Sequence, residues 1–173
     1  DKLLTLKRAH LVKLSPAFWF VTVLAGVLTL ARFSDAFLVL KANDVGLGAT
    51  GAPVILMIMN IMYAAIVYPA GRLQDILGEY EILALSILAL AAADTVLAFS
   101  LSPSGVFLGA SLWGLHMGLS QGVLTAVVAK EAPAALRGTA FGIFNFISGI
   151  AVLCASVLAG FLWKYFGPSH TFM

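Results

Sequence analysis

The chain has 173 residues, of which 61% are hydrophobic and 10% are charged, and its formal net charge is +2. A soluble domain has about 45–50% apolar and about 25% charged residues, so this composition is typical of a membrane protein. The small net charge, without any Lys/Arg run interleaved with aromatic residues, excludes a nucleic-acid partner.

Five apolar runs predict membrane-spanning helices, because an apolar core about 30 Å thick takes about 20 helical residues. We expect these helices at residues 17–40, 52–70, 82–99, 105–129 and 139–166. The segments between them are short and rich in residues that end helices, so neighbouring helices should pack antiparallel. The predicted fold class is all-α: a polytopic transmembrane bundle in residues 17–173, after a cytoplasmic linker segment at residues 1–16.

Both ends of the chain suggest a longer protein. The basic opening segment has no apolar core followed by a cleavage site, so it is interpreted as a linker rather than a signal peptide. After Gly167 and Pro168 a sixth span could begin, and the chain stops at Met173. We therefore expect five spans and the start of a sixth.

The distribution of Lys and Arg predicts the orientation in the membrane. The side of the amino end carries seven basic residues outside the spans, and the opposite side carries two, Lys41 and Lys164. The seven are Lys2, Lys7, Arg8, Lys13, Arg72, Lys130 and Arg137. The positive-inside rule therefore predicts a cytoplasmic amino end.

Arg32 and Asp35 interrupt the first apolar run. Each charge near a helix centre costs about 2.5–3.5 kcal/mol on insertion, so an intramembrane pair indicates a functional site. In one continuous helix the i,i+3 spacing would place both side chains on one face, where they can meet. We expect Asp35 to exchange a proton or bind a cationic group, with Arg32 as its electrostatic partner. The alternative is a structural ion pair within the helix.

The fourth predicted span carries two neighbouring rows of side chains. Trp113, Met117 and Gln121 recur every four residues, and His116 and Ser120 form the adjacent row. The polar members therefore face one side of the helix. His116 titrates near physiological pH, which favours proton relay or substrate hydrogen bonding. The alternative is a neutral histidine bonded to a neighbouring helix.

Three intramembrane amides, Asn60, Gln121 and Asn145, are candidates for lining a substrate cavity, and equally for hydrogen bonding between helices.

Small residues at four-residue spacing predict a close packing seam between helices, with helix bending as the alternative. They are Gly114, Gly118 and Gly122.

The sequence offers little for metal, redox or hydrolytic chemistry. Cys154 is the only cysteine, so an internal disulfide and a cysteine metal cluster are excluded, and we expect a buried small side chain there. The chain has no H-E-x-x-H motif and no second histidine near His116. The sequence therefore predicts neither an enzyme nor a metal or cofactor site.

Two connecting segments resemble loops of major facilitator superfamily transporters. GRLQDILG, with Gly71, Asp75 and Gly78, is similar to the G-x-L-x-D-R-x-G-R-R loop of that superfamily. APAALRGTAFGIFNFISG, with Arg137 and Asn145, is similar to its loop and helix entry between helices ten and eleven. The whole chain thus resembles the carboxyl-terminal half of such a transporter, from helix seven to the start of helix twelve.

This resemblance implies two six-helix halves with a substrate cavity between them, and transport by alternating access. It implies a secondary transporter, proton-coupled, in a bacterial inner membrane, with a small-molecule substrate and the lipid bilayer as partners. The other half would be a missing amino-terminal portion or a second copy of the chain.

The first motif departs from the superfamily pattern at its basic positions, which hold Ile76, Glu79 and Tyr80. The charge latch that Asp75 forms there in the superfamily is therefore weakened, and a non-transporting scaffold or receptor is the alternative function. Asp75 could instead pair with Arg72 or Arg137, or remain solvated.

Overall fold

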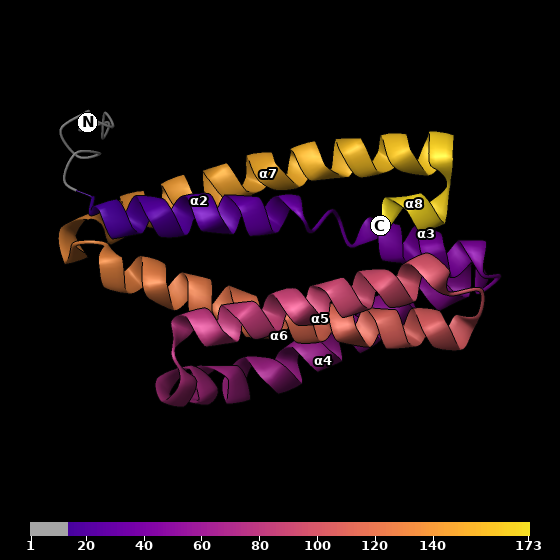
Figure 1. Cartoon of the computed structure of the whole chain (residues 1–173), viewed down its shortest axis with the longest axis horizontal. Coiled ribbons are helices and arrows are strands. Elements are labelled where there is room, and N and C mark those ends of the chain that lie inside the picture. The colour runs from indigo at the N-terminus through magenta and orange to yellow at the C-terminus, as the bar shows by residue number, and fades with distance from the viewer. Residues whose placement is uncertain (1–13) are drawn as a thin grey trace.

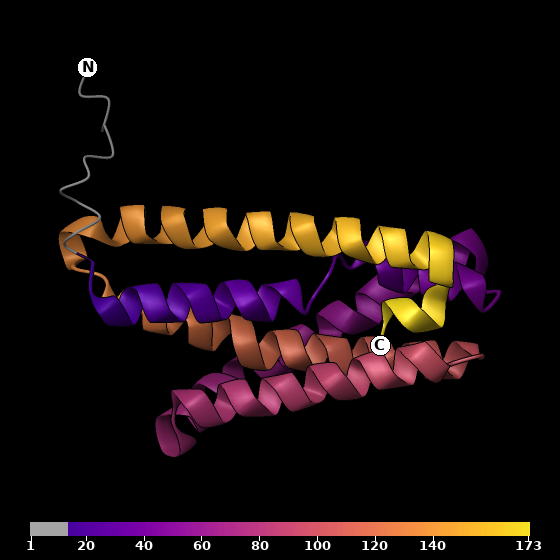
Figure 2. The same ribbon diagram turned by 45° about the horizontal axis from the view of Figure 1, so that its top comes forward.

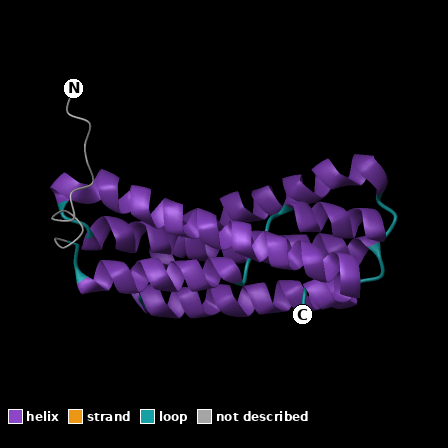
Figure 3. Cartoon of the chain, turned by 90° about the horizontal axis from the view of Figure 1, so that it is seen from above, coloured by secondary structure: helices purple, strands orange, loops and turns teal. Residues whose placement is uncertain are grey.

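The computed structural model describes residues 14–173, which form helices and no strand (Figure 1). The long helices run along the long axis of the molecule (Figure 3). In chain order the elements are α2 (Pro16–Leu30), α3 (Ala36–Asp44), α4 (Gly48–Leu77), α5 (Glu79–Phe99), α6 (Pro103–Glu131), the 3₁₀ turn η1 (Ala134–Leu136), α7 (Arg137–Phe166) and α8 (Pro168–Thr171).

The helices form two groups that share α6. In Figures 1 and 2, α6 lies along α4 and α5, and these make the three-helix group. Helix α2 lies along α7, and these make the α2–α7 pair. Helix α6 also contacts α2, so it connects the two groups.

Close approach of α6 to α4 depends on two glycines. A Cβ added at Gly114 would collide with the carbonyl oxygen of Met59, and one added at Gly118 would lie 2.8 Å from the Cβ of Ile66. The predicted packing seam is therefore confirmed at these two positions, because backbones approach only where side chains are small. At Gly122 the added Cβ would make an ordinary contact of 3.7 Å with Val67.

Four helices are long and apolar enough to cross a membrane: Pro53–Leu77, Glu79–Phe99, Pro103–Glu131 and Ala134–Phe166. The second predicted span, 52–70, is longer than expected because α4 continues to Leu77. The predicted loop at 71–81 is therefore wrong, and the turn from α4 to α5 is Gly78 alone. Its φ of 111° lies in the region that favours glycine.

The first predicted span is not one helix, so the prediction of a continuous helix over 17–40 is wrong. Helix α2 has 15 residues and α3 has 9, so each is shorter than the roughly 20 residues of a full crossing. Between them residues 31–35 leave the helical path. Ser34 contributes to the break: its side-chain oxygen accepts a hydrogen bond from the N–H of Ala36 at 3.3 Å, which competes with helical bonding.

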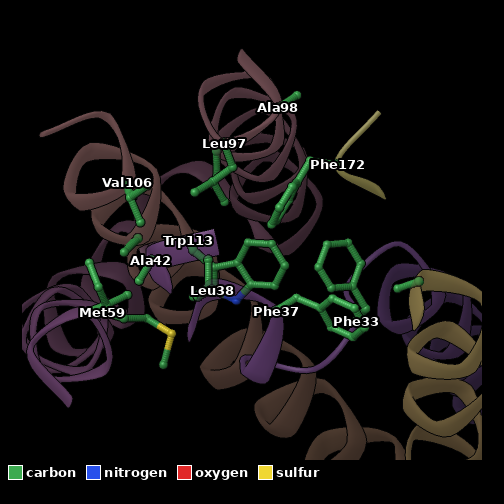
Figure 4. Close-up of a cluster of buried hydrophobic side chains, with 14 of the residues drawn as sticks. Phe33, Phe37, Leu38, Ala42, Met59, Leu97, Ala98, Val106, Trp113 and Phe172 are labelled. Carbon is green, nitrogen blue, oxygen red and sulfur yellow. The ribbon is translucent and has the colours of Figure 1, made fainter. Parts of the chain in front are cut away.

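Two buried clusters hold the helices together. The aromatic end cluster, at the α3 and α8 end, includes Phe33, Phe37, Leu38, Trp113 and Phe172 (Figure 4). The second cluster joins α2 to α6 and includes Phe18, Val21, Ala25, Leu119 and Val123. Burial of such side chains between helices fixes the positions of α2 and α3, on the two sides of the break.

Three further expectations need correction or lie outside the described residues. Cys154 is exposed on α7, not buried. Lys41 lies within α3, with 2% of its side chain exposed, and pairs with Asp44 at 3.4 Å instead of standing in a loop. Four of the seven basic residues behind the predicted orientation fall in residues 1–13, as does most of the predicted linker, outside the described part.

Candidate functional site

A cavity of about 290 Å³ lies between α2, α6 and α7. Its apolar lining includes Leu28, Leu124, Phe144 and Val152. Its polar lining is Thr29, Arg32, His116, Ser120, Gln121, Thr125, Asn145 and Ser148. A concave site with apolar walls and a few converging polar groups is the usual form of a small-molecule site.

Four of the seven residues predicted for substrate or proton coupling meet in this cavity. Arg32 comes from the end of the α2 segment, His116 and Gln121 come from α6, and Asn145 comes from α7. Residues far apart in the sequence thus converge, which single-helix patterns could not show.

Arg32 lies in the break between α2 and α3, and Asp35 stands at the start of α3. Because the helix is interrupted between them, they do not share a helix face. Ion pairs within residues 14–173 involve Lys41 with Asp44 and Lys130 with Glu79, not Arg32 with Asp35. The alternative of a structural ion pair within one helix is therefore wrong, and Asp35 is half-buried outside the cavity lining.

The polypeptide of the break is held in place by α7. The N–H of Ser34 donates to the hydroxyl oxygen of Ser156 at 3.2 Å. The neighbouring Phe33 ring packs against Phe37, Trp113 and Phe172 with centroid distances of 5.1, 5.3 and 5.3 Å. Non-helical backbone at membrane depth persists only where protein covers it or a cavity adjoins it, and both conditions hold here.

His116 is bonded to a neighbouring helix, as the alternative for this residue predicted. Its Nδ1 lies 2.8 Å from the carbonyl oxygen of Ser86 on α5. A carbonyl oxygen only accepts, so Nδ1 carries the hydrogen. Nε2 is then the ring atom able to accept a hydrogen bond or a proton, and the side chain still lines the cavity.

Asn60 and Trp113 lie outside the cavity. The Asn60 amide donates to the carbonyl oxygen of Leu56 in its own helix at 2.7 Å, and the residue is exposed. Trp113 has no exposed surface and belongs to the aromatic end cluster, where its Nε1 has no hydrogen-bond partner within the described residues.

Sequence reasoning missed three polar residues of the cavity lining, Thr29, Thr125 and Ser148. Each stands three or four positions from a residue that was predicted: Arg32, Gln121 and Asn145. That spacing places neighbours on the same helix face, so it was the signal that could have found them.

Comparison with known proteins decides the family. The Major Facilitator Superfamily profile matches residues 14–173. The chain belongs to the Major Facilitator Superfamily. It is also 30% identical over 157 residues to an uncharacterised MFS-type transporter of Methanocaldococcus jannaschii, across 87% of this chain and 39% of that relative. The chain thus spans about two fifths of the relative's length, and no solved structure matches it.

Membership of the superfamily makes the chain part of an integral multi-pass membrane protein and agrees with the helices long enough to span a bilayer. Within residues 14–173, no three His, Cys, Asp or Glu side chains gather in a way that could hold a metal ion. The cavity between α2, α6 and α7, with its converging polar side chains, is the candidate functional site.

The superfamily loop motif has an unusual charge arrangement in this chain. Gly71 and Asp75 lie in the last turns of α4, and no ion pair to Asp75 forms within the described residues. Arg137, at the start of α7, donates from Nε to the carbonyl oxygen of Ala129 at 3.2 Å. Neither predicted partner of Asp75 is engaged with it, since the guanidinium of Arg72 lies over the Tyr68 ring, 4.9 Å from its centroid.

An ion pair does form beside this motif. Glu79, at a position that is basic in the superfamily motif, accepts from Lys130 Nζ at 3.0 Å. The pair connects the start of α5 to the end of α6. The side chain of Lys130 is 66% exposed and that of Glu79 is 25% exposed, so solvent screens the pair.

Proposed function

We propose that this chain forms one half of a secondary active transporter that moves a small molecule by alternating access. The observation that supports the proposal is the break at residues 31–35 beside a polar cavity. Interrupted membrane helices at a polar midplane cavity are a recurrent feature of secondary transporters. The break puts polar backbone and the Arg32 side chain beside the same cavity.

The cavity favours a second half as partner. Within the described residues it is bordered by α2, α6 and α7, and Asn145 on its wall is exposed. A partner half would cover this wall and complete a site between halves. We propose an amino-terminal half of the same protein or a second copy of the chain, with the amino end cytoplasmic and the assembly in a bacterial inner membrane.

Proton coupling is assigned to Asp35 in this proposal. Asp35 stands at the amino end of α3 but makes no capping hydrogen bond, and no ion pair engages it within residues 14–173. Its carboxyl group is thus available for proton exchange, three positions from Arg32 in the break. A proton gained or lost here changes the charge beside the cavity, so it can bias which side the cavity faces.

Uptake by proteoliposomes carrying the intact transporter tests this assignment. Asp35→Asn keeps the size of the side chain and removes its titration, so an imposed proton gradient should no longer drive accumulation, while substrate exchange continues. Glu81→Gln is the control, since Glu81 is an exposed carboxylate on α5. Normal accumulation by the Asp35→Asn variant against a gradient would move coupling to another group, and His116 would be examined next.

A non-transporting scaffold or receptor is the second candidate. The observation favouring it is that Asp75 forms no ion pair within residues 14–173, in a motif whose basic positions hold Ile76, Glu79 and Tyr80. In the same proteoliposomes, the scaffold would show no saturable uptake and no counterflow with any substrate offered. Saturable counterflow would exclude it.

A further inference from the structure

The charge on the cavity wall has one sign. Among residues 14–173, Arg32 is the only formally charged side chain in the lining when His116 is neutral, and no Asp or Glu of this part lines the cavity. Within residues 14–173 no carboxylate oxygen lies within ion-pairing distance of the Arg32 guanidinium. The Asp35 carboxylate acts on Arg32 only from beyond that distance and lies outside the lining, so the half-buried guanidinium is free to contact an anion supplied by a ligand.

The other polar groups of the lining divide into donors and acceptors. Within the described chain, the side-chain amides of Gln121 and Asn145 and the Arg32 guanidinium take part in no hydrogen bond, so their N–H groups are available. The hydroxyls of Thr29 and Ser120 instead donate to carbonyls in their own helices, at 2.6 and 2.9 Å. Their oxygens remain able to accept from a ligand.

The hydroxyl of Thr125 also donates within its own helix, to the carbonyl oxygen of Gln121 at 2.7 Å, so its oxygen remains able to accept from a ligand. The cavity thus offers N–H donors around one cation and a set of hydroxyl acceptors. The part of the cavity that this chain forms has a volume of about 290 Å³, equal to that of about ten water molecules at about 30 Å³ each, which is room for a small molecule.

We infer that the cavity binds a small monocarboxylate that also carries hydroxyl or amino groups. The carboxylate lies on the guanidinium of Arg32, and the hydroxyl or amino groups donate to Thr29, Ser120 and Thr125. This inference rests on the proposed function and names its substrate class. A carboxylate is favoured over a phosphate monoester, because one cation matches one negative charge and a monoester carries about −1.5 to −2.

Thermal unfolding of the purified intact transporter in detergent tests the inference. The probes are lactate, glycerate and gluconate, each compared with its own amide, which has nearly the same shape without the charge. We expect the carboxylates to raise Tm and the amides to have no effect, since a ligand that binds only the folded state stabilises it. Glycerol 3-phosphate is the phosphate probe, and it should not raise Tm.

Variants locate the binding. Arg32→Gln should weaken carboxylate binding about 10- to 100-fold, the effect of losing charge-assisted hydrogen bonds. Arg32→Lys keeps the charge and should retain part of the affinity. Lys164→Gln is the matched control, because Lys164 is an exposed cation at the far end of α7, and it should bind like the unmodified protein. Unchanged ligand-free Tm values show that each variant is folded.

Several results would overturn the inference: equal stabilisation by amides or phosphate, equal binding by Arg32→Gln, or no stabilisation by any carboxylate. Uptake measurements distinguish failure of the carboxylate inference from failure of the proposed transport function. Carboxylate binding that depends on Arg32, without counterflow of that carboxylate, would support the anion site and contradict the proposed transport function. Saturable uptake of an uncharged or cationic solute would support the proposed transport function and contradict the anion site.

Discussion

The three-helix group and the α2–α7 pair are both apolar, yet they use their small and polar residues differently. In the three-helix group, Gly114 and Gly118 bring α6 against the backbone of α4. In the pair, Gly149 faces open space and lines the cavity. Glycine thus serves close packing in one region and leaves the cavity open in the other. The comparison shows that small-residue spacing alone does not separate a packing seam from a site.

Replacing glycine by leucine in each of the two regions should give the largest difference between them. Gly114→Leu overpacks the α4–α6 contact and should destabilise the protein by about 3 kcal/mol, because the Met59 carbonyl cannot move away cheaply. Gly149→Leu should change the free energy of unfolding by less than about 0.5 kcal/mol, since its side chain enters the cavity. Equilibrium unfolding in detergent micelles measures both.

Transport assays complete that test. Gly149→Leu should lower saturable uptake at least about tenfold by filling the cavity, an effect equivalent to about 1.4 kcal/mol. Gly142→Leu is the control, because Gly142 is exposed on the same helix and outside the lining. Comparable losses of stability at Gly114 and Gly149 would show that the two regions are equally tightly packed.

Substitution of Ser156 tests how much its hydrogen bond with the break at residues 31–35 stabilises the α2–α7 pair. Ser156→Ala deletes the acceptor of the Ser34 N–H and should cost about 1 kcal/mol, the low end of the penalty for an unsatisfied donor, because this hydrogen bond is only partly buried. Ser111→Ala is the matched control, since the Ser111 hydroxyl donates to the Phe107 carbonyl of its own helix and its loss should cost little. Equal unfolding free energies for the two variants would mean that water or another group replaces Ser156.

The smallest effect is expected at the ion pair that joins the start of α5 to the end of α6 in the three-helix group. Lys130→Ala and Glu79→Ala, combined in a double-mutant cycle, should show almost no coupling in the free energy of unfolding, because solvent screens the pair. Salt should reduce the coupling further. A coupling as large as the effect of Ser156→Ala would show that the pair acts as a strong latch despite its exposure.

Hydropathy predicted most of the fold because burial in lipid requires long apolar helices whatever their partners. It missed the break at residues 31–35, since Phe33 is apolar and the hydrogen bond from Ser34 to Ser156 depends on a helix far along the chain. It also predicted a loop over residues 71–81, where polar residues continue α4 beyond the apolar run.

The site was partly predictable. Arg32, His116, Gln121 and Asn145 were recognisable as polar residues in apolar helices, and they do line one cavity. Trp113 shares the four-residue row of Gln121 but lies two turns away, where the aromatic end cluster fills the space around it. Which part of a helix face adjoins a cavity depends on the neighbouring helices, which one helix's periodicity does not specify.

The contact between Ser34 and Ser156 also has a consequence for biosynthesis. The two residues are 122 positions apart, and ribosomes add roughly 5–20 residues per second, so about 6–25 s separate their synthesis. During that interval α2 and α3 are each too short to cross the bilayer, and the acceptor for their connecting segment has not been made. The segment from α2 to α3 is therefore made before its partner on α7, and it can reach its final position in the membrane only after α7 has been synthesised.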